Sequence, residues 1–264
     1  MKLTGVPETL VMPLWARAAE TAMPDGLIRD PRSIEMVESL DYDFSKFEGN
    51  WRLQLKVAIR TMLLDHAVQD FLSRHPAGHV VNIGAGLDTR FARLDNQLVR
   101  WFDLDVPETI ALRRRFFQDS DRNRMIECSV FDDRWFEAID YRGGPLLLIA
   151  EGVLPYFPEE QVKQLMEKLA RTFPGAEMLL QTTTRLIVAR NHRDANDKFK
   201  SAKLYWGVES GKELTAWKGI ELLHDWVKGS FCRARWRGWW WWVSFPPFAR
   251  YWHNRIVHIR FART

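Results

Sequence analysis

The sequence predicts an α/β fold with a doubly wound, mostly parallel sheet that follows an N-terminal helical segment. From His79 onward, apolar strand-like runs alternate with helical ones, a pattern typical of parallel sheets. The first of these runs passes directly into a glycine-containing turn, HVVNIGAGLDTR at residues 79–90. Because open α/β sheets bind ligands at the carboxyl ends of their strands, we expect a binding site at this turn.

Residues 1–75 are expected to form a helical cap. Apolar side chains recur every three or four residues between Leu53 and Leu72, which is the period of an amphipathic helix. Asp30-Pro31 interrupts the helical pattern, as a proline does at a helix boundary. The cap is therefore predicted to contain more than one helix.

Residues 76–184 are expected to form the core of the sheet. Five strand-like runs read VVNIG, VRWFDLD, RMIECSV, LLLIAE and EMLLQTTT. An amphipathic helix, PEEQVKQLMEKLARTF, precedes the fifth run, with Glu159 and Glu160 in its first turn and Pro174-Gly175 after its end. Acids at the start and Pro-Gly after the end are the signals that helix termini favour.

The remaining residues are predicted to form a lid and the end of the sheet. Residues 185–228 are expected to be a helical lid insertion, with a second helix near Glu213 to Val227. Residues 229–264 are expected to supply C-terminal strands, because RIVHIRF at 255–261 alternates and contains β-branched residues. No long polar linker divides the chain, so residues 1–264 are predicted to form a single domain.

Four consecutive tryptophans, Trp239 to Trp242, follow Arg233, Arg235 and Arg237. Three interpretations are open for them. The indole rings could pack against the sheet, line a pocket for a large apolar acceptor, or contact a membrane interface.

Composition excludes several classes of protein. The 38 basic and 34 acidic residues are interleaved over 264 residues, so no nucleic-acid partner is predicted. Two cysteines exclude a disulfide framework and a thiolate metal cage, and no metal is predicted. No segment approaches the ~18 apolar residues of a membrane span, and the N-terminus has no cleavage signal. We expect a cytoplasmic monomer or homodimer without stable membrane insertion.

The glycine-containing turn predicts a cofactor loop. Gly84 and Gly86 allow a sharp turn that approaches a ligand closely. Asp88 follows within reach of an amine or a bound water. Thr89 stands where a dinucleotide fingerprint has its third glycine, which favours a cofactor without phosphates.

Acids also end the neighbouring strands. Asp103 and Asp105 lie 17 and 19 residues beyond Gly86, close to the ~20 residues at which such folds place a ribose-binding acid. Alternation sends both side chains to one face, so either could be the ligand. Glu151 ends the apolar run LLLIA, where α/β sheets bind ligands.

A resemblance to a known family rests on the segments GAGLDTR, WFDLDVPE and AEGVLPYF, with SAKLYWG and GIELLHDW further on. With them the chain resembles the leucine carboxyl methyltransferase family, especially its bacterial branch that includes polyketide O-methyltransferases. The match runs from about Arg60 to Tyr156 and more loosely to the end. It implies a Rossmann-like class I methyltransferase fold with a seven-stranded sheet, and S-adenosylmethionine as cofactor.

The resemblance also implies a cofactor pocket. Arg60 would hold the methionine carboxylate, with Arg17 assisting from the cap, and Glu151 would approach the ammonium group. Gly84 would lie along the methionyl backbone with Asp88 nearby. Asp105 would bind the ribose hydroxyls, with Asp103 as the alternative.

The adenine pocket departs from part of the family. Many members carry Asp-Leu after the third strand, where this chain has Ser129-Val130. Adenine would then be bound by the Ser129 hydroxyl, the Val130 backbone or Asp132.

We expect an S-adenosylmethionine-dependent O-methyltransferase acting on a carboxylate or hydroxyl of a small or medium-sized, polyketide-like metabolite. A carboxylate needs a cation to orient it, and the candidates are Tyr156, Arg185, Arg190 and Arg193. A hydroxyl needs a general base, for which His192 and His224 are candidates.

Three alternatives are open: a second kind of methyltransferase, which is the runner-up, and two proteins of other classes. A protein C-terminal carboxyl methyltransferase would need a groove for a peptide tail. The absent third glycine argues against an NAD-dependent oxidoreductase. The set of Arg60, Asp88, Asp105 and Glu151 argues against a non-catalytic binding module.

Overall fold

In a computed structural model of the chain, which describes residues 8–193, 203–246 and 248–263, seven strands form one sheet in the order β3-β2-β1-β4-β5-β7-β6. The strands β1 to β5 are parallel, and β7 runs antiparallel between β5 and β6. Their bounds are His79–Ile83 (β1), Arg100–Asp105 (β2), Asn123–Glu127 (β3), Leu146–Ala150 (β4), Glu177–Thr182 (β5), Ile220–Val227 (β6) and Arg255–Phe261 (β7). The predicted mostly parallel, seven-stranded sheet is confirmed.

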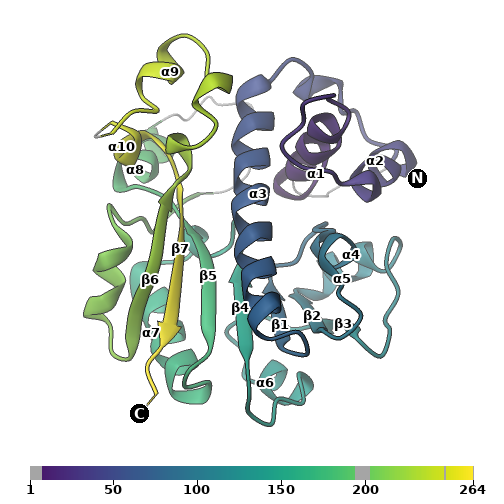
Figure 1. The fold of residues 1–264 in the computed structure, drawn as a ribbon, viewed down its shortest axis with the longest axis vertical. Helices are drawn as coiled ribbons and strands as arrows, with labels where there is room; N and C mark the ends of the chain where they lie inside the picture. Colours follow the sequence, from purple (N-terminus) through teal and green to yellow (C-terminus); the bar gives the residue numbers. More distant parts are fainter. Residues whose placement is uncertain (1–7, 194–202, 247, 264) are drawn as a thin grey trace.

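Helices cover both faces of the sheet. The long helix α3 (Trp51–Arg74) crosses one face and α7 (Glu159–Thr172) lies on the other (Figure 1). Along β4, Leu146 and Leu148 belong to the core on the α7 side, whereas Leu147 and Ile149 belong to the core on the α3 side. Successive side chains of a strand point to opposite faces, so the continuous apolar run of β4 is explained by burial on both sides.

The predicted cap contains α1 (Glu8–Thr21), α2 (Pro31–Ser39), the short 3-10 helix η1 (Ser45–Phe47) and α3. Side chains cap two of these helices: Asp30 accepts a hydrogen bond from the backbone N–H of Ser33, and Asn50 accepts one from that of Leu53. Figure 1 shows α1 and α2 beside one half of α3, at the end of the molecule where β1 and β2 terminate. The cap therefore lies over the carboxyl ends of the strands.

Short helices and loops make up the remaining described chain. The helices are α4 (Arg90–Leu94), α5 (Pro107–Arg113), α6 (Arg134–Ala138), η2 (Leu154–Tyr156), α8 (Arg185–Arg193), η3 (Gly211–Ala216), η4 (Lys228–Ser230), η5 (Arg233–Arg235), α9 (Trp239–Trp242) and α10 (Ala249–Trp252). The helices α8, α9 and α10 gather at the same end of the molecule as the cap, on the other side of α3 (Figure 1).

The prediction of a helix near Glu213 to Val227 is wrong. A 3-10 turn, η3, is followed by β6, which pairs antiparallel with β7. The apolar residues of this segment fit a helical period, but β7 offers an edge whose backbone groups need partners. Tertiary pairing therefore decided between the two structures.

Two further boundaries of the prediction need correction. Within the predicted lid, 185–228, helix is described only in α8, η3 and the start of η4, and residues 194–202 lie outside the described residues. Among the described residues of the predicted C-terminal strands, 229–264, β7 alone is a strand, and short helices precede it. The predicted strand over 255–261 is confirmed as β7, which pairs antiparallel with both β5 and β6.

The tryptophan run forms the single-turn helix α9. Trp240 packs toward α3, with the Nζ atom of Lys56 4.5 Å from its ring centroid. Trp239 and Trp242 are each 64% exposed. The interpretation that the indole rings pack against the rest of the protein therefore holds for Trp240 but not for Trp239 and Trp242.

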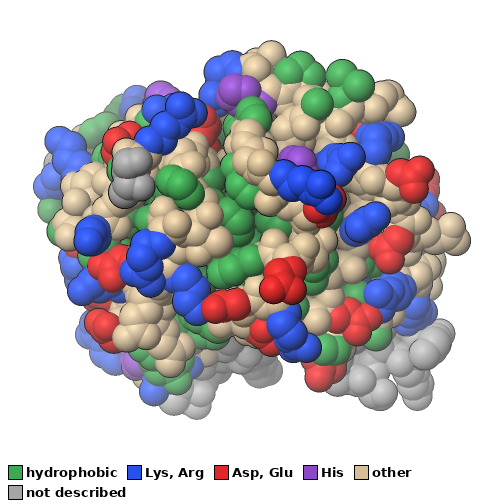
Figure 2. All heavy atoms as spheres, turned by 90° about the horizontal axis from the view of Figure 1, so that it is seen from below, with side chains coloured by type: hydrophobic (Ala, Val, Ile, Leu, Met, Phe, Trp, Pro, Cys, Tyr) green, Lys and Arg blue, Asp and Glu red, His purple; other side chains and the backbone are tan. Residues whose placement is uncertain are grey.

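The surface at the amino ends of the parallel strands is seen in Figure 2. Acidic and basic side chains are interspersed on this face, with hydrophobic side chains between them (Figure 2). Over the part of the chain that the structure describes, no helix combines the length and the apolar character needed to cross a membrane.

Candidate functional site

A cavity of about 420 Å³ opens at the carboxyl ends of β1, β2 and β4, beneath the cap. Eight of the residues predicted to bind the cofactor line it: Arg60, Gly84, Gly86, Asp88, Asp105, Ser129, Val130 and Glu151. The alternatives Asp103 and Asp132 are not among its described lining residues. Arg17 and Tyr156 line it as well. The fold thus brings together residues from α1, α3, three strand ends and the turn after β4.

The turn after β1 requires glycine. Gly84 has φ +66°, and a Cβ atom there would lie 2.2 Å from Cγ2 of Val153. The backbone N–H of Gly84 donates to the carbonyl of Leu104 at 2.8 Å, which ties the turn to β2. Only a residue without a side chain allows this close approach at positive φ.

The turn presents one acid of β2 to the cavity. Asp105 accepts hydrogen bonds from the backbone N–H groups of Gly86 and Val106, each at 2.8 Å. Burial raises the pKa of Asp105, and these hydrogen bonds partly oppose the shift. Asp103 instead lies in the core, 0% exposed, with Oδ2 2.7 Å from Nη2 of Arg113. Of the two alternatives, only Asp105 lines the cavity.

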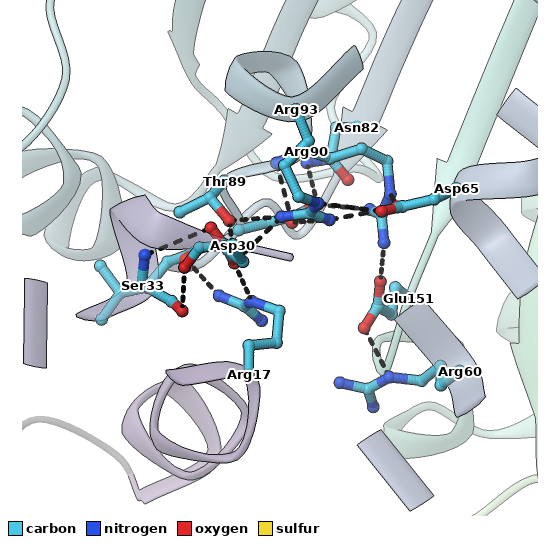
Figure 3. A network of polar contacts seen from close by, with 12 residues as sticks. Arg17, Asp30, Ser33, Arg60, Asp65, Asn82, Thr89, Arg90, Arg93 and Glu151 are labelled. Atoms are coloured by element: carbon cyan, nitrogen blue, oxygen red, sulfur yellow. Dashed lines mark hydrogen bonds and ion pairs between the residues drawn. The ribbon is translucent and has the colours of Figure 1, made fainter. Parts of the chain in front are cut away.

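Glu151, directly after β4, lies between two guanidinium groups (Figure 3). Its Oε1 is 2.5 Å from Nε of Arg60, and its Oε2 accepts a hydrogen bond from Nη2 of Arg90 at 2.6 Å. Burial alone would raise the pKa of Glu151, but Arg60 and Arg90 hold it below its ordinary value. The wall of the cavity therefore carries an ionised acid next to a cation.

A network of buried charges supports this wall (Figure 3). Arg90 also pairs with Asp88 and, at 2.7 Å, with Asp65 on α3. Burial opposes ionisation of Asp88, but the neighbouring guanidinium groups, Arg90 first, hold its pKa well below the ordinary range. Arg93 donates to Oδ2 of Asp65 at 2.9 Å. Buried charges of this kind stabilise a site only when each is paired.

Sequence reasoning missed this support. Arg90 stands inside the GLDTR motif, but its partner Asp65 lies on a cap helix, and nothing local links the two. Two polar contacts also hold the side chain of Arg17 in place. Its Nε atom lies 2.9 Å from Oδ2 of Asp30, and its Nη2 atom donates to the carbonyl of Leu87 at 2.8 Å. These contacts join the cap to the cofactor loop.

The structure places one of the three candidates for catalysis in the wall of the cavity and the other two elsewhere. Tyr156 lines the cavity, where burial raises the pKa of its hydroxyl against the opposing effect of Arg60. Arg190 lies with Cζ 3.9 Å from the ring centroid of Trp252, and Nε2 of exposed His192 lies 2.5 Å from the carbonyl of Leu204. Neither Arg190 nor His192 is among the described residues that line the cavity, so their roles in catalysis stay predictions.

The other residues considered for the acceptor or for adenine also lie elsewhere. Arg185 pairs with Glu213, His224 stacks on Trp226 at 5.0 Å on β6, and Asp132 lies 2.6 Å from Arg134. Arg193, at the end of α8, is exposed. Of the three residues considered for adenine, Ser129 and Val130 line the cavity, and Asp132 is not among its described lining residues.

The strand order and the cavity at the strand ends define a class I methyltransferase fold. An O-methyltransferase family protein from Burkholderia thailandensis has this fold with a TM-score of 0.50 at 15% identity, over 88% of this chain and 68% of that one. Magnesium protoporphyrin IX methyltransferase from Synechocystis PCC 6803, solved with bound S-adenosylhomocysteine, has a TM-score of 0.50 at 11% identity, over 89% of this chain and 94% of that one.

The chain belongs to the leucine carboxyl methyltransferase family, whose model matches residues 10–170. It is 36% identical to the tetracenomycin polyketide synthesis O-methyltransferase TcmP of Streptomyces glaucescens, over 86% of this chain and 84% of that protein. A putative S-adenosyl-L-methionine-dependent methyltransferase of Frankia alni is 29% identical over 81% of each chain. The protein is therefore an S-adenosylmethionine-dependent methyltransferase, as the sequence motifs predicted.

Proposed function

We propose that the protein transfers the methyl group of S-adenosylmethionine to an oxygen, carboxylate or hydroxyl, of a small or medium-sized metabolite. The observation that carries this proposal is the 36% identity, over most of both chains, to a relative named as an O-methyltransferase of polyketide synthesis. Two cysteines and a chain without a predicted membrane span favour action on a cytoplasmic metabolite.

The charges in the cavity fit the cofactor. The methionine end of S-adenosylmethionine carries a carboxylate and an ammonium group, and the wall offers Arg60 beside ionised Glu151. Arg60 would hold the carboxylate and Glu151 the ammonium, so each group of the wall keeps a partner of opposite charge. Asp105 would bind the ribose hydroxyls, and Ser129 and Val130 would border the adenine.

When bound, the cofactor supplies an electrophilic methyl group on a sulfonium. The residues of this chain contribute mainly by alignment, because a displacement of this kind accelerates when the accepting oxygen is held in line and close. Tyr156 is the described cavity residue suited to hold that oxygen. A phenol is protonated at neutral pH and burial raises the pKa of Tyr156 further, so its hydroxyl can donate a hydrogen bond to that oxygen.

The first test is calorimetric titration of the full chain with S-adenosylmethionine, S-adenosylhomocysteine and NADH. We expect saturable binding of both adenosyl ligands and none of NADH. Asp105→Ala should weaken that binding, whereas Asp132→Ala, which changes an acid outside the cavity, should not. Binding of NADH alone would contradict the proposal.

The second test follows label from methyl-labelled S-adenosylmethionine into a panel of aromatic carboxylic acids, phenols and peptides with free C-termini. Label in a base-labile ester or a stable ether of a small acceptor supports the proposal. Label confined to the peptides would instead identify a protein carboxyl methyltransferase.

A further inference from the structure

A line of cations runs along α3 from the surface to the cavity. Arg52, Lys56 and Arg60 are four residues apart, a spacing that places them on one face of a helix. Arg52 is exposed, Lys56 is half-buried, and Arg60 lines the cavity. The short helix η4 packs against α3 and adds Lys228, which is 5% exposed. We call these four residues the cationic stripe.

The two lysines of the cationic stripe have no acid of their own among the described residues. Within the described residues, neither Lys56 nor Lys228 forms an ion pair, and the acid whose charge acts on Lys228 is Glu151, which already pairs with Arg60 and Arg90. Like charges at this spacing repel, and burying an unpaired ammonium is costly. An anion placed here would remove both penalties.

The titration of the two lysines agrees with this geometry. Burial, with the charges of Arg60 and Lys56, holds the pKa of Lys228 well below its ordinary value. Burial and the charge of Arg52 lower the pKa of Lys56 to about 8. Both ammonium groups would therefore gain from a negative partner.

Aromatic rings line the same region. The ring of Trp240 lies 4.5 Å from Nζ of Lys56 and 5.5 Å from Cζ of Arg52. His253 lies edge-on to Trp236 at 4.7 Å and to Trp240 at 5.9 Å. His253 is 2% exposed, and its Nε2 has no hydrogen-bond partner among the described residues. A ligand with an aromatic body and a negative group matches this combination of cations and rings.

We infer that Lys228 and Lys56, together with Trp240, bind an anionic group of an aromatic acceptor beside the cofactor cavity. This inference rests on the proposed function and assigns residues that determine acceptor specificity.

The test compares two probes of equal shape, 2-naphthoate and its neutral amide, by calorimetry on the full chain saturated with S-adenosylhomocysteine. We expect naphthoate to bind at least tenfold more tightly than the amide. Lys228→Met should remove most of that preference, and Lys228→Arg should retain part of it. Lys168→Met, which removes a partly exposed lysine paired with Asp133, serves as the matched control and should keep the full preference.

Two outcomes separate this inference from the proposed function. If the wild type binds S-adenosylhomocysteine but takes naphthoate and the amide equally, the inference is overturned and the proposed function stands. If S-adenosylhomocysteine does not bind, the proposed function itself fails. Should Lys228→Met not fold, Lys56→Met provides the same comparison, and an unchanged preference in that variant also overturns the inference.

Discussion

The Nε atom of Arg60 lies 2.5 Å from Oε1 of Glu151, so a cation on a cap helix and an acid at the end of β4 meet in the wall of the cavity. Both residues line the cavity, and Arg90 holds the other carboxylate oxygen of Glu151 at 2.6 Å. The carboxylate of a zwitterionic amino acid can pair with Arg60 and its ammonium group with Glu151, so that two ion pairs would replace the one between these residues. The pair therefore connects the fold to the proposed cofactor site.

We predict that Glu151→Gln weakens binding of S-adenosylmethionine at least tenfold and lowers the melting temperature. The variant leaves Arg60 and Arg90 without a shared counter-charge, and breaking a buried pair costs about 3–5 kcal/mol. Calorimetry and thermal unfolding measure the two effects. Glu160→Gln, at an exposed position on α7, is the control, and equal behaviour of the two variants would contradict the prediction.

Substitution of Asp105 should mainly weaken cofactor binding, whereas substitution of Asp103 should mainly lower the stability of the fold. Asp105→Asn is expected to weaken S-adenosylhomocysteine binding at least tenfold with a small change in stability, because Asp105 lines the cavity. Asp103→Asn leaves Arg113 buried with a weakened partner, so it should lower the free energy of unfolding by several kcal/mol, on the order of a broken buried pair. Denaturant unfolding and calorimetry on both variants distinguish the roles. The opposite assignment of effects would show that the ribose site is misplaced.

Gly84→Ala should destabilise the protein more than Gly49→Ala. The two glycines have similar dihedral angles, φ +66° and φ +71°, but a Cβ atom at Gly84 would meet Val153 at 2.2 Å whereas one at Gly49 has nothing within 4 Å. Both variants bear the cost of positive φ, and Gly84→Ala adds overpacking of about 1–3 kcal/mol. Denaturant unfolding measures the difference, and equal losses would refute the steric argument.

His253 should make stability depend on pH. Burial, with the charges of Lys56 and Lys228, lowers the pKa of His253 from 6.5 to about 3. Below pH 6.5 the unfolded chain then binds a proton that the folded chain does not, so this contribution is complete above pH 6.5 and is lost as the pH falls toward 3. At about 1.36 kcal/mol per pH unit, the loss from pH 7 to pH 4 is at most about 3 kcal/mol.

The measurement is the free energy of unfolding between pH 4 and pH 7 for the wild type and His253→Asn. The variant should show a shallower slope over this range, even though its stability at pH 7 is lower. Identical slopes would mean that His253 is accessible to protons in the folded state.

The main features of the cofactor site could be predicted because they are local. Gly84 and Gly86 follow a strand directly, and Asp105 and Glu151 end two others. Parallel strands bring their carboxyl ends to one edge of the sheet, so identifying the strands was enough to bring these residues together. Helical residues such as Arg190 and His192 have no such constraint, and their chemical type alone did not place them at the cavity.

The sequence by itself determined the parallel core, the glycine turn and the acids at the strand ends, since period and turn chemistry act over a few neighbouring residues. Only the tertiary structure decided that residues 220–227 form a strand, because the partner is β7, more than twenty residues later. The tertiary structure alone also placed Asp105, and not Asp103, in the wall of the cavity. It likewise paired Glu151 with Arg60 and brought Lys228 to the face of α3. These outcomes depend on burial and on charges that are distant along the chain, and no local sequence pattern predicts either of them.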